Sequence, residues 1–447
     1  MSSNLDWFLD ARFGVSIHWG PYSIPARGEW VRSSEQISPE DYDRYAREFN
    51  PDRYDPNEWA ALIRASGGKY AVLTAKHHDG FCLWDTATTD FKSRTDLIRP
   101  FLEAMRAEGL RVGVYFSLLD WHHPDFPHYG DRQHPERFNP KWQGHEHDWD
   151  RFLDYSFAQL RELLTQYGKL DQLVLDFSYW NFIGEGWRAT ELVKMIRELQ
   201  PGIILNDRLG GDIKGHPKPW VGDYDSPELN VPREPVTNAR GERVPFETWI
   251  TLNNSWGYSA SDHHYKSPTD VIRALVNCVS KGGNLLVNLS PDGRGQIPDA
   301  AHDILYEVGD WLDLNGESIY GCRDAELPKP EWGRWTACGD RLYAHFLEQP
   351  LGHANLPGLR GKVGDARLVA TGAEAFLSDF WNFPVQNFDG PEDIFLNWAR
   401  PTQATFPLPD ARDTVVRLRL LTKAEQAKAH TQLENGRRRL DGREPFA

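Results

Sequence analysis

Short apolar segments alternate with longer amphipathic segments through most of the chain. The short segments are rich in Val, Ile, Leu and Phe and are apolar on both faces, which is typical of parallel strands covered by helices. Eight strands are predicted, of which the sixth has the weakest pattern. They span residues 13–19, 70–76, 111–117, 172–178, 202–208, 219–225, 248–254 and 284–290.

Helical periodicity fills the intervals between these strands. Ser38 is placed to cap one helix, and Gly109 and Gly168 end two others, because Ser favours the N-cap and Gly the position after the last turn. The predicted helices span residues 38–49, 56–68, 95–109, 148–168, 187–202, 267–283 and 299–316. Repeated alternation of strand and helix predicts an α/β fold, a (β/α)8 TIM-like barrel, over residues 1–322.

The pattern changes after Gly316. Short β-forming runs at 341–347, 366–371 and 414–421 are separated by Gly and Pro turns. This pattern predicts a C-terminal antiparallel β-sandwich over residues 323–421. Residues 422–447 are predicted to form a helical or disordered tail.

Composition excludes several classes of function. The net charge of -15 disfavours nucleic-acid binding, which needs clustered Lys and Arg. Apolar runs are only strand-length, so no membrane association is expected. The N-terminus lacks a basic segment followed by an apolar one, which favours a cytoplasmic protein. The oligomeric state stays open, and a homo-oligomer is compatible with the sequence.

Polar residues gather where the predicted strands end. In (β/α)8 enzymes the active site lies at the carboxyl ends of the strands. Because the polar residues follow the carboxyl ends of the strands, they are predicted to form one polar rim of the barrel that carries the function. Its members include His18, His77, His78, Asp79, Asp120, Asp176, Asn206, Asp207, Arg208, Asp223, Asp225, Glu228, Asn253 and Asn288.

Asp176 interrupts an apolar strand, where a buried carboxylate is costly unless it is paired or hydrogen-bonded. It is either a structural residue bonded to Arg208 or a nucleophile or base. Glycoside hydrolysis needs two carboxyl groups across a sugar ring, and Asp176 would supply one. The candidates for the second are Glu228, Glu247, Asp223, Asp225 and Glu29.

A metal site is not predicted. His77 and His78 are adjacent, so on a strand they point to opposite faces and do not share one ion unless the chain bends. The end of the first strand also lacks a His-x-His pair. Neutral imidazoles that hydrogen-bond sugar hydroxyls fit this pattern better, and neither a metal nor another cofactor is expected.

Nine motifs make the sequence resemble the retaining α-L-fucosidases of glycoside hydrolase family 29. They are collinear over nearly all of the predicted barrel. They lie at residues 13–30, 69–86, 113–124, the strand with Asp176, 205–208, 222–228, 247–258, 282–298 and 315–321.

The resemblance implies a role for each matching residue. Asp176 matches the nucleophile, and Glu228 matches a segment expected to carry the acid/base, with Glu247 as the alternative and Glu29 third. The substrate would be a fucosylated glycan or a small fucoside. The residues that the resemblance implies for sugar binding are His18, Glu29, Trp30, His77, His78, Arg208 and Trp256.

One departure from the family pattern bears on specificity. The family usually has Trp-x-Asp-Gly around the nucleophile, whereas this sequence has Val174 and Phe177 in place of the Trp and the Gly. Two alternatives to a retaining α-L-fucosidase therefore stay open. One is a related barrel glycosidase with altered specificity for the sugar, and the other is a non-catalytic carbohydrate-binding protein.

Overall fold

A computed structural model describes residues 4–180, 182–210, 218, 220–350, 353–378, 392–398 and 407–429. The chain forms two compact units, Met1–Asp310 and Trp311–Ala447. The sequence pattern places the end of the barrel domain at residue 322, and helix α9 (Asp299–Asn315) spans the division between the two units.

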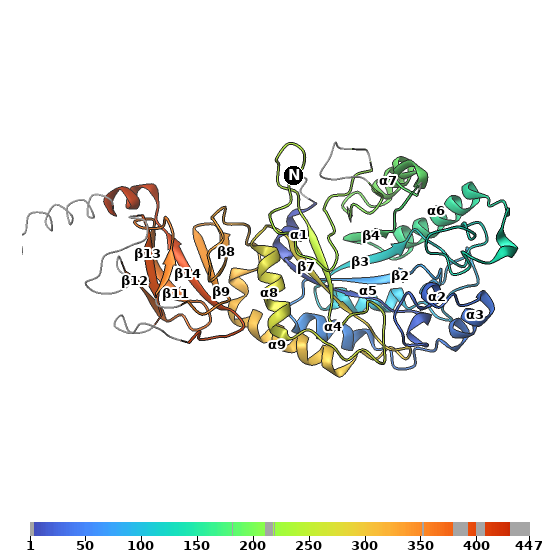
Figure 1. Cartoon of the computed structure of the whole chain (residues 1–447), viewed down its shortest axis with the longest axis horizontal. Coiled ribbons are helices and arrows are strands. Elements are labelled where there is room, and N and C mark those ends of the chain that lie inside the picture. The colour runs from blue at the N-terminus through green and yellow to red at the C-terminus, as the bar shows by residue number, and fades with distance from the viewer. Residues whose placement is uncertain are drawn as a thin grey trace, which may run out of the picture. The chain divides into compact units, whose positions relative to one another are not determined.

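The first unit is built on a parallel sheet of seven strands in the order β5-β4-β3-β2-β1-β7-β6 (Figure 1). Neighbouring strands pair in parallel throughout, as the apolar runs predict. The strands are β1 (Phe13–Ile17), β2 (Tyr70–Lys76), β3 (Arg111–Ser117), β4 (Gln172–Asp176), β5 (Ile204–Leu205), β6 (Glu247–Thr251) and β7 (Asn284–Leu289).

Helices follow most of the strands, and their caps match the sequence signals. Ser38 accepts the Asp41 N–H at the start of α3, and Ser267 forms a capping box with Asp270 at the start of α8. The helices before α9 are α1 (Asp6–Ala11), α2 (Val31–Ser34), α3 (Pro39–Glu48), α4 (Pro56–Ala65), α5 (Ile98–Ala107), α6 (Trp149–Gln166), α7 (Ala189–Leu199) and α8 (Pro268–Val279).

The prediction of a strand at 219–225 is wrong, because the described residues of this segment form only single bridges. Tyr224 bridges to Asn206, and Asp225 bridges to Phe246, both in parallel. The Asp223 carboxylate accepts the Leu205 N–H at 2.8 Å. In a regular sheet a backbone carbonyl of the neighbouring strand would accept this N–H, so here a side chain replaces a backbone hydrogen bond. These bridges close the ring between β5 and β6.

A third bridge, Glu228 to Trp249, extends this closure toward the carboxyl ends of the strands. Backbone hydrogen bonds run from Trp249 N to Pro227 O at 3.0 Å and from Leu229 N to Trp249 O at 2.8 Å. The irregular segment therefore fixes the backbone on both sides of Glu228.

Alternate residues of the strands fill the barrel interior. Val72, Tyr115, Val174, Trp249 and Leu286 belong to one buried cluster. Because side chains alternate between the faces of a strand, the residues two positions further on face the same interior. The register pairs two such residues, Ser117 and Asp176, at the carboxyl end of the ring.

The second unit contains an antiparallel sheet of seven strands in the order β10-β13-β12-β11-β14-β9-β8. Trp332, Trp335 and Phe346 lie in its buried core. Residues 423–429 of the tail are helical, and residues 430–447 lie outside the described residues. The strands are β8 (Gly333–Cys338), β9 (Arg341–Phe346), β10 (Ala354–Leu356), β11 (Val363–Leu368), β12 (Glu374–Ser378), β13 (Ile394–Asn397) and β14 (Thr414–Leu420).

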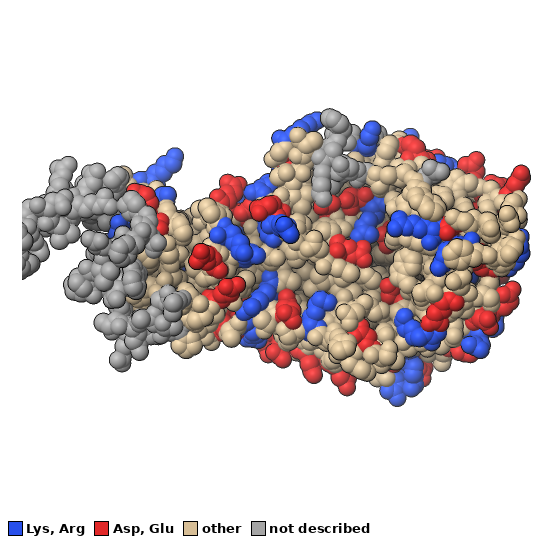
Figure 2. Space-filling model, viewed as in Figure 1, with Lys and Arg blue, Asp and Glu red and all other residues tan. Residues whose placement is uncertain are grey.

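Within the described part of the chain, every helix is too short or too polar to cross a bilayer. On the face of the first unit shown in Figure 2, acidic and basic side chains are interspersed, without a broad basic area.

Candidate active site

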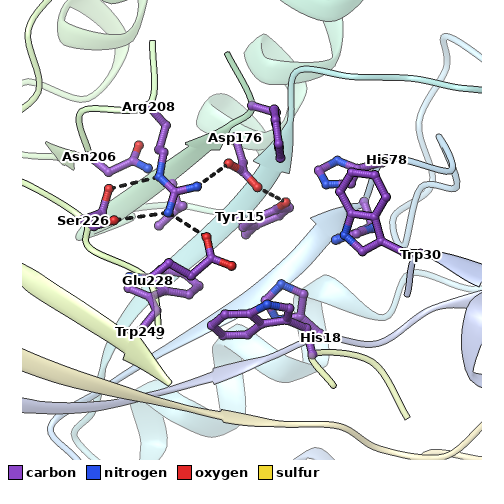
Figure 3. A pocket seen from close by; sticks show the side chains of 14 residues that line it. His18, Trp30, His78, Tyr115, Asp176, Asn206, Arg208, Ser226, Glu228 and Trp249 are labelled. Atoms are coloured by element: carbon purple, nitrogen blue, oxygen red, sulfur yellow. Dashed lines mark hydrogen bonds and ion pairs between the residues drawn. The ribbon is translucent and has the colours of Figure 1, made fainter. Parts of the chain in front are cut away.

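A cavity of about 100 Å³ lies at the carboxyl ends of the barrel strands (Figure 3). Eight of the ten predicted site residues line it, and Glu29 and Glu247 do not. The lining consists of His18, Trp30, His77, His78, Tyr115, Val174, Asp176, Phe177, Asn206, Arg208, Ser226, Glu228, Trp249 and Trp256.

Two carboxylates of the cavity share one guanidinium. Arg208 donates from Nη1 to Asp176 Oδ1 at 3.0 Å and from Nη2 to Glu228 Oε2 at 2.9 Å (Figure 3). Because a guanidinium is rigid and planar, the two bonded oxygens lie no more than about 8 Å apart. Arg208 thus holds the two acidic side chains close enough for both to reach a single sugar ring.

The charge of Arg208 is maintained although burial opposes it. Burial alone would lower the pKa of the guanidinium, but the negative charges of Asp176 and Glu228 outweigh this effect and raise the pKa. Ser226 fixes the same guanidinium, accepting Nη2–H at its carbonyl oxygen at 3.1 Å. Arg208 therefore remains a cation that orients both carboxylates.

The second oxygen of Asp176 is also hydrogen-bonded. The hydroxyl of Tyr115, on the neighbouring strand β3, donates to Asp176 Oδ2 at 2.6 Å. Burial, together with the charge of Asp176, raises the pKa of Tyr115 well above its usual range, so the phenol stays protonated and donates. Asp176 is therefore oriented by one bond to each oxygen.

Hydrogen bonds fix the tautomers of two histidines. His18 Nδ1 lies 2.6 Å from Asn288 Oδ1, an oxygen that only accepts, so His18 Nδ1 carries the proton. His78 Nδ1 lies 2.7 Å from Ser117 Oγ, which donates its own proton to the Leu119 carbonyl at 2.8 Å. In both rings Nε2 is left as an acceptor for a ligand hydroxyl.

Burial keeps these imidazoles neutral. It lowers the pKa of His18 to about 4 and that of His78 to about 3. It also lowers the pKa of His77, whose ring stacks on Tyr115 with centroids 5.7 Å apart. Neutral rings both donate and accept hydrogen bonds, which suits recognition of hydroxyl groups.

Aromatic side chains complete the wall of the cavity. Trp30 packs edge-on against His78 with centroids 5.0 Å apart, and Phe177 contacts the same imidazole at 5.5 Å. On another side, Trp256 lies 5.3 Å from His18 and 6.3 Å from Trp249. The cavity therefore combines hydroxyl-binding groups with apolar surface.

The structure buries Glu29 beside the cavity, where it holds a loop. Its Oε2 accepts the Gly257 N–H at 2.7 Å and the Ser255 hydroxyl at 3.4 Å. These bonds fix the turn that carries Trp256. The sugar-contacting role expected for Glu29 stays a prediction.

Glu247 lies within the barrel and outside the cavity lining. Its carboxyl group accepts hydrogen bonds from Tyr70 at 2.6 Å, from Trp249 Nε1 at 2.7 Å and from Gln172 at 3.1 Å. Burial raises the pKa of Glu247 to about 7. These bonds connect Glu247 to Trp249, a residue of the cavity lining.

No group of three His, Cys, Asp or Glu side chains in the described ranges is arranged to hold a metal ion. His77 and His78 do lie close together, with ring centroids 4.1 Å apart, because the chain leaves β2 before them. The bend brings both rings to the cavity as neutral polar groups.

Several lining residues escaped the sequence analysis. Tyr115 and Trp249 belong to apolar strand runs and resemble ordinary core residues. Ser226 directly follows the segment 219–225 that was mispredicted as a strand. Asn206 was noted only as part of the rim, and it bonds Leu175 through both its amide atoms at 3.0 and 2.9 Å. The signal for Tyr115 was its inward-facing position on β3, the strand next to the one that carries Asp176.

Comparison with known proteins gives consistent matches. The sequence profile described as alpha-L-fucosidase matches residues 2–317. The chain is 30% identical over 382 residues to tissue alpha-L-fucosidase from Homo sapiens, covering 77% of this chain and 76% of the human protein.

Two solved structures extend the similarity over nearly the whole chain. Alpha-L-fucosidase isoenzyme 1 from Paenibacillus thiaminolyticus gives a TM-score of 0.90 at 51% identity, covering 94% of this chain and 99% of that one. The second structure is a GH29 alpha-L-fucosidase from Bacteroides thetaiotaomicron, a trapped covalent intermediate in complex with 2-fluoro-fucosyl fluoride. It gives a TM-score of 0.79 at 26% identity, covering 94% of this chain and 97% of that one. Together with the two sheets, these matches confirm the predicted fold class.

Proposed function

The chain belongs to the α-L-fucosidase family of glycoside hydrolases, and on this premise we propose that it hydrolyses terminal α-L-fucosyl linkages with retention of configuration. The nucleophile is Asp176 and the acid/base is Glu228. The observation that carries the proposal is the pair of carboxylates bound to the two terminal nitrogens of Arg208, inside a cavity lined by neutral histidines and aromatic rings.

In the first step, an Asp176 oxygen attacks the anomeric carbon of the bound fucoside. Glu228, which must enter this step in its protonated form, gives its proton to the glycosidic oxygen, and the bond between that oxygen and the anomeric carbon breaks. Arg208 and Tyr115 hold Asp176 in one orientation, which reduces the entropy lost on reaching the transition state. The product of this step is a β-fucosyl ester.

In the second step, Glu228 takes a proton from water, and the water oxygen attacks the anomeric carbon. The ester bond to Asp176 breaks, so two inversions leave the configuration unchanged. The Bacteroides relative is described as a trapped covalent intermediate, which supports the same route in this chain.

Glu228 suits the acid/base role better than Glu247. Its side chain is 41% exposed and lines the cavity, so it has access to both the leaving group and water. Glu247 is fully buried among donors that already occupy its oxygens. An acid/base that cannot reach water cannot complete the second step.

The shape of the cavity favours a 6-deoxy sugar. His18 and His78 each present an Nε2 acceptor for a sugar hydroxyl, as their tautomers require. Trp256 and Trp249 offer an apolar surface for a methyl group. A hydroxyl on C6 would lose its hydrogen bonds to water there, at a cost of about 1–3 kcal/mol.

The test is the anomer formed first. The proton NMR spectrum of 4-nitrophenyl α-L-fucoside during hydrolysis is expected to show α-L-fucose before mutarotation, and initial β-L-fucose would refute retention. The matched α-L-galactoside, which adds only the C6 hydroxyl, is expected to react at least tenfold more slowly. Binding of L-fucose without turnover of either substrate would instead indicate a non-catalytic sugar-binding protein.

A further inference from the structure

Exposed apolar side chains are concentrated beside the two carboxylates. Large hydrophobic side chains are exposed at eight positions in the described part of the chain, and three of them lie in the loops that follow Asp176 and Glu228. Trp180 is 60% exposed, Leu229 is 59% exposed and Ile183 is 47% exposed. None of the three lines the cavity itself.

Trp180 lies at the tip of a tight hairpin. Tyr179 and Phe182 exchange backbone hydrogen bonds of 3.1 and 2.9 Å, which places Trp180 in the connecting turn. The φ of Trp180 is 49°, in the left-handed region that turns usually fill with Gly, Asn or Asp. Turn formation alone therefore does not account for a tryptophan at this position.

The base of this hairpin is rigid. The Tyr179 hydroxyl donates to Asp131 Oδ2 at 2.6 Å, and its ring packs edge-on against Phe177 at 5.8 Å. Phe177 lines the cavity and directly follows Asp176. Since four residues span at most about 14 Å, the Trp180 backbone lies within that distance of the Asp176 backbone.

Leu229 shows the same combination of features beside the other carboxylate. It directly follows Glu228, its φ is 56°, and its backbone N–H is bound to the Trp249 carbonyl at 2.8 Å. A leucine rarely adopts the left-handed region, because its Cβ then lies too close to the following carbonyl oxygen. The backbone is therefore held so that an apolar side chain stands in solvent next to the proposed acid.

We propose that Trp180 and Leu229 form a binding surface for the leaving group of the fucoside, contacting the apolar face of a departing sugar or aryl ring. This inference rests on the proposed function, because the leaving group lies on the side of the acid that protonates it. Stacking on Trp180 and contact with Leu229 remove apolar area of both partners from water. The two residues select the leaving group without touching the fucosyl ring.

The experiment compares substrates that differ only in the leaving group. The reference is α-L-fucosyl fluoride, whose leaving group is a single atom, and the test substrates are 4-nitrophenyl α-L-fucoside and an α-L-fucosyl disaccharide. The measured quantity is the ratio of kcat/KM for each test substrate to kcat/KM for the fluoride. This ratio isolates the contribution of the leaving-group surface.

The variants keep the backbone and remove the apolar surface. Trp180→Asn and Leu229→Asn each introduce an asparagine, which tolerates the left-handed backbone conformation of these positions. Each is expected to lower the ratio roughly fivefold to thirtyfold for at least one test substrate, as loss of one buried apolar contact predicts. Trp180→Phe is expected to keep the ratio within about threefold of the wild-type value, because it retains an aromatic face.

The matched control is Phe138→Asn, at a residue 67% exposed in another loop. It is expected to leave both ratios unchanged. A loss confined to the nitrophenyl ratio identifies an aryl-binding surface, and a loss confined to the disaccharide ratio identifies a sugar-binding one. If wild-type protein hydrolyses all three substrates and neither Asn variant changes a ratio, the leaving-group surface is refuted while the proposed function stands. If wild-type protein hydrolyses none of them, both proposals fail.

Discussion

The phenolic hydroxyl of Tyr115 lies 2.6 Å from Oδ2 of Asp176, across the pair of strands β3 and β4. Arg208 occupies the other oxygen, so the carboxylate is held from two directions. An isolated carboxylate would rotate about its terminal bond. Here both oxygens are fixed relative to the cavity.

Replacing Tyr115 tests how much the fixed orientation of the Asp176 carboxylate contributes to catalysis. Tyr115→Phe removes a hydrogen bond to a charged acceptor, which is worth about 1.5–3 kcal/mol. We therefore expect kcat/KM for 4-nitrophenyl α-L-fucoside to fall roughly tenfold to hundredfold, with the far-UV spectrum unchanged. Steady-state kinetics on the purified variant measure this, and a rate within twofold of wild type would contradict it.

Glu228→Ala tests the assignment of the acid/base. Loss of a general acid costs about 10²- to 10⁴-fold when the leaving group needs a proton. We expect this loss in kcat/KM for an α-L-fucosyl disaccharide and a much smaller loss for α-L-fucosyl fluoride. With α-L-fucosyl fluoride as the substrate, azide, a small nucleophile that needs no base, is expected to attack the β-fucosyl ester in place of water, restore turnover and give α-L-fucosyl azide. Equal losses on both substrates would argue against Glu228.

The buried Glu247 predicts a pH-dependent stability. Its pKa is raised from 4.5 in the unfolded chain to about 7 in the folded one, chiefly by burial. Between these values the folded state holds a proton that the unfolded state has lost, so this residue makes the protein less stable as the pH rises from about 4.5 to 7.

Glu247→Gln removes this titration. The variant also loses part of the hydrogen bonding to Tyr70 and Trp249, which shifts its stability equally at all pH values. Relative to wild type, its free energy of unfolding is therefore expected to improve between pH 5 and pH 8, by on the order of 3 kcal/mol. Urea unfolding at both pH values measures the change, and a pH-independent difference would refute it.

Neutral histidines predict the pH range of sugar binding. Because burial lowers the pKa of His18 to about 4 and that of His78 to about 3, both keep an acceptor Nε2 well below pH 6.5. The inhibition constant of L-fucose is therefore expected to change less than twofold between pH 7 and pH 5. If it weakened tenfold by pH 5, these imidazoles would be titrating near their ordinary value.

Much of the barrel and its site followed from the sequence. Apolar runs located seven strands, and polar residues at their ends brought Asp176, Arg208 and the histidines to one rim. The prediction succeeds because parallel strands end at the same edge of the sheet. The alternation of side chains between the two faces of a strand also fixes which residues point into the barrel. Asp176 was recognisable since a carboxylate is rare inside an apolar run.

Other parts depended on information that a single sequence lacks. Segment 219–225 contains β-forming residues, but Asp223 satisfies a neighbouring N–H with its side chain, which no periodicity reveals. Glu247 and Glu228 look alike as acidic residues near strand ends. Only the packing of Tyr70 and Trp249 around Glu247 shows that this carboxyl group is buried, whereas that of Glu228 is accessible.

The central claim is that Asp176 bonds covalently to the sugar. The direct measurement is mass spectrometry of peptides from protein incubated with 2-deoxy-2-fluoro-α-L-fucosyl fluoride, with Asp176→Ala as the matched control. We expect one fluorofucosyl group, located on Asp176 and absent from the variant. A label on another carboxylate, or turnover without any covalent adduct, would contradict the account.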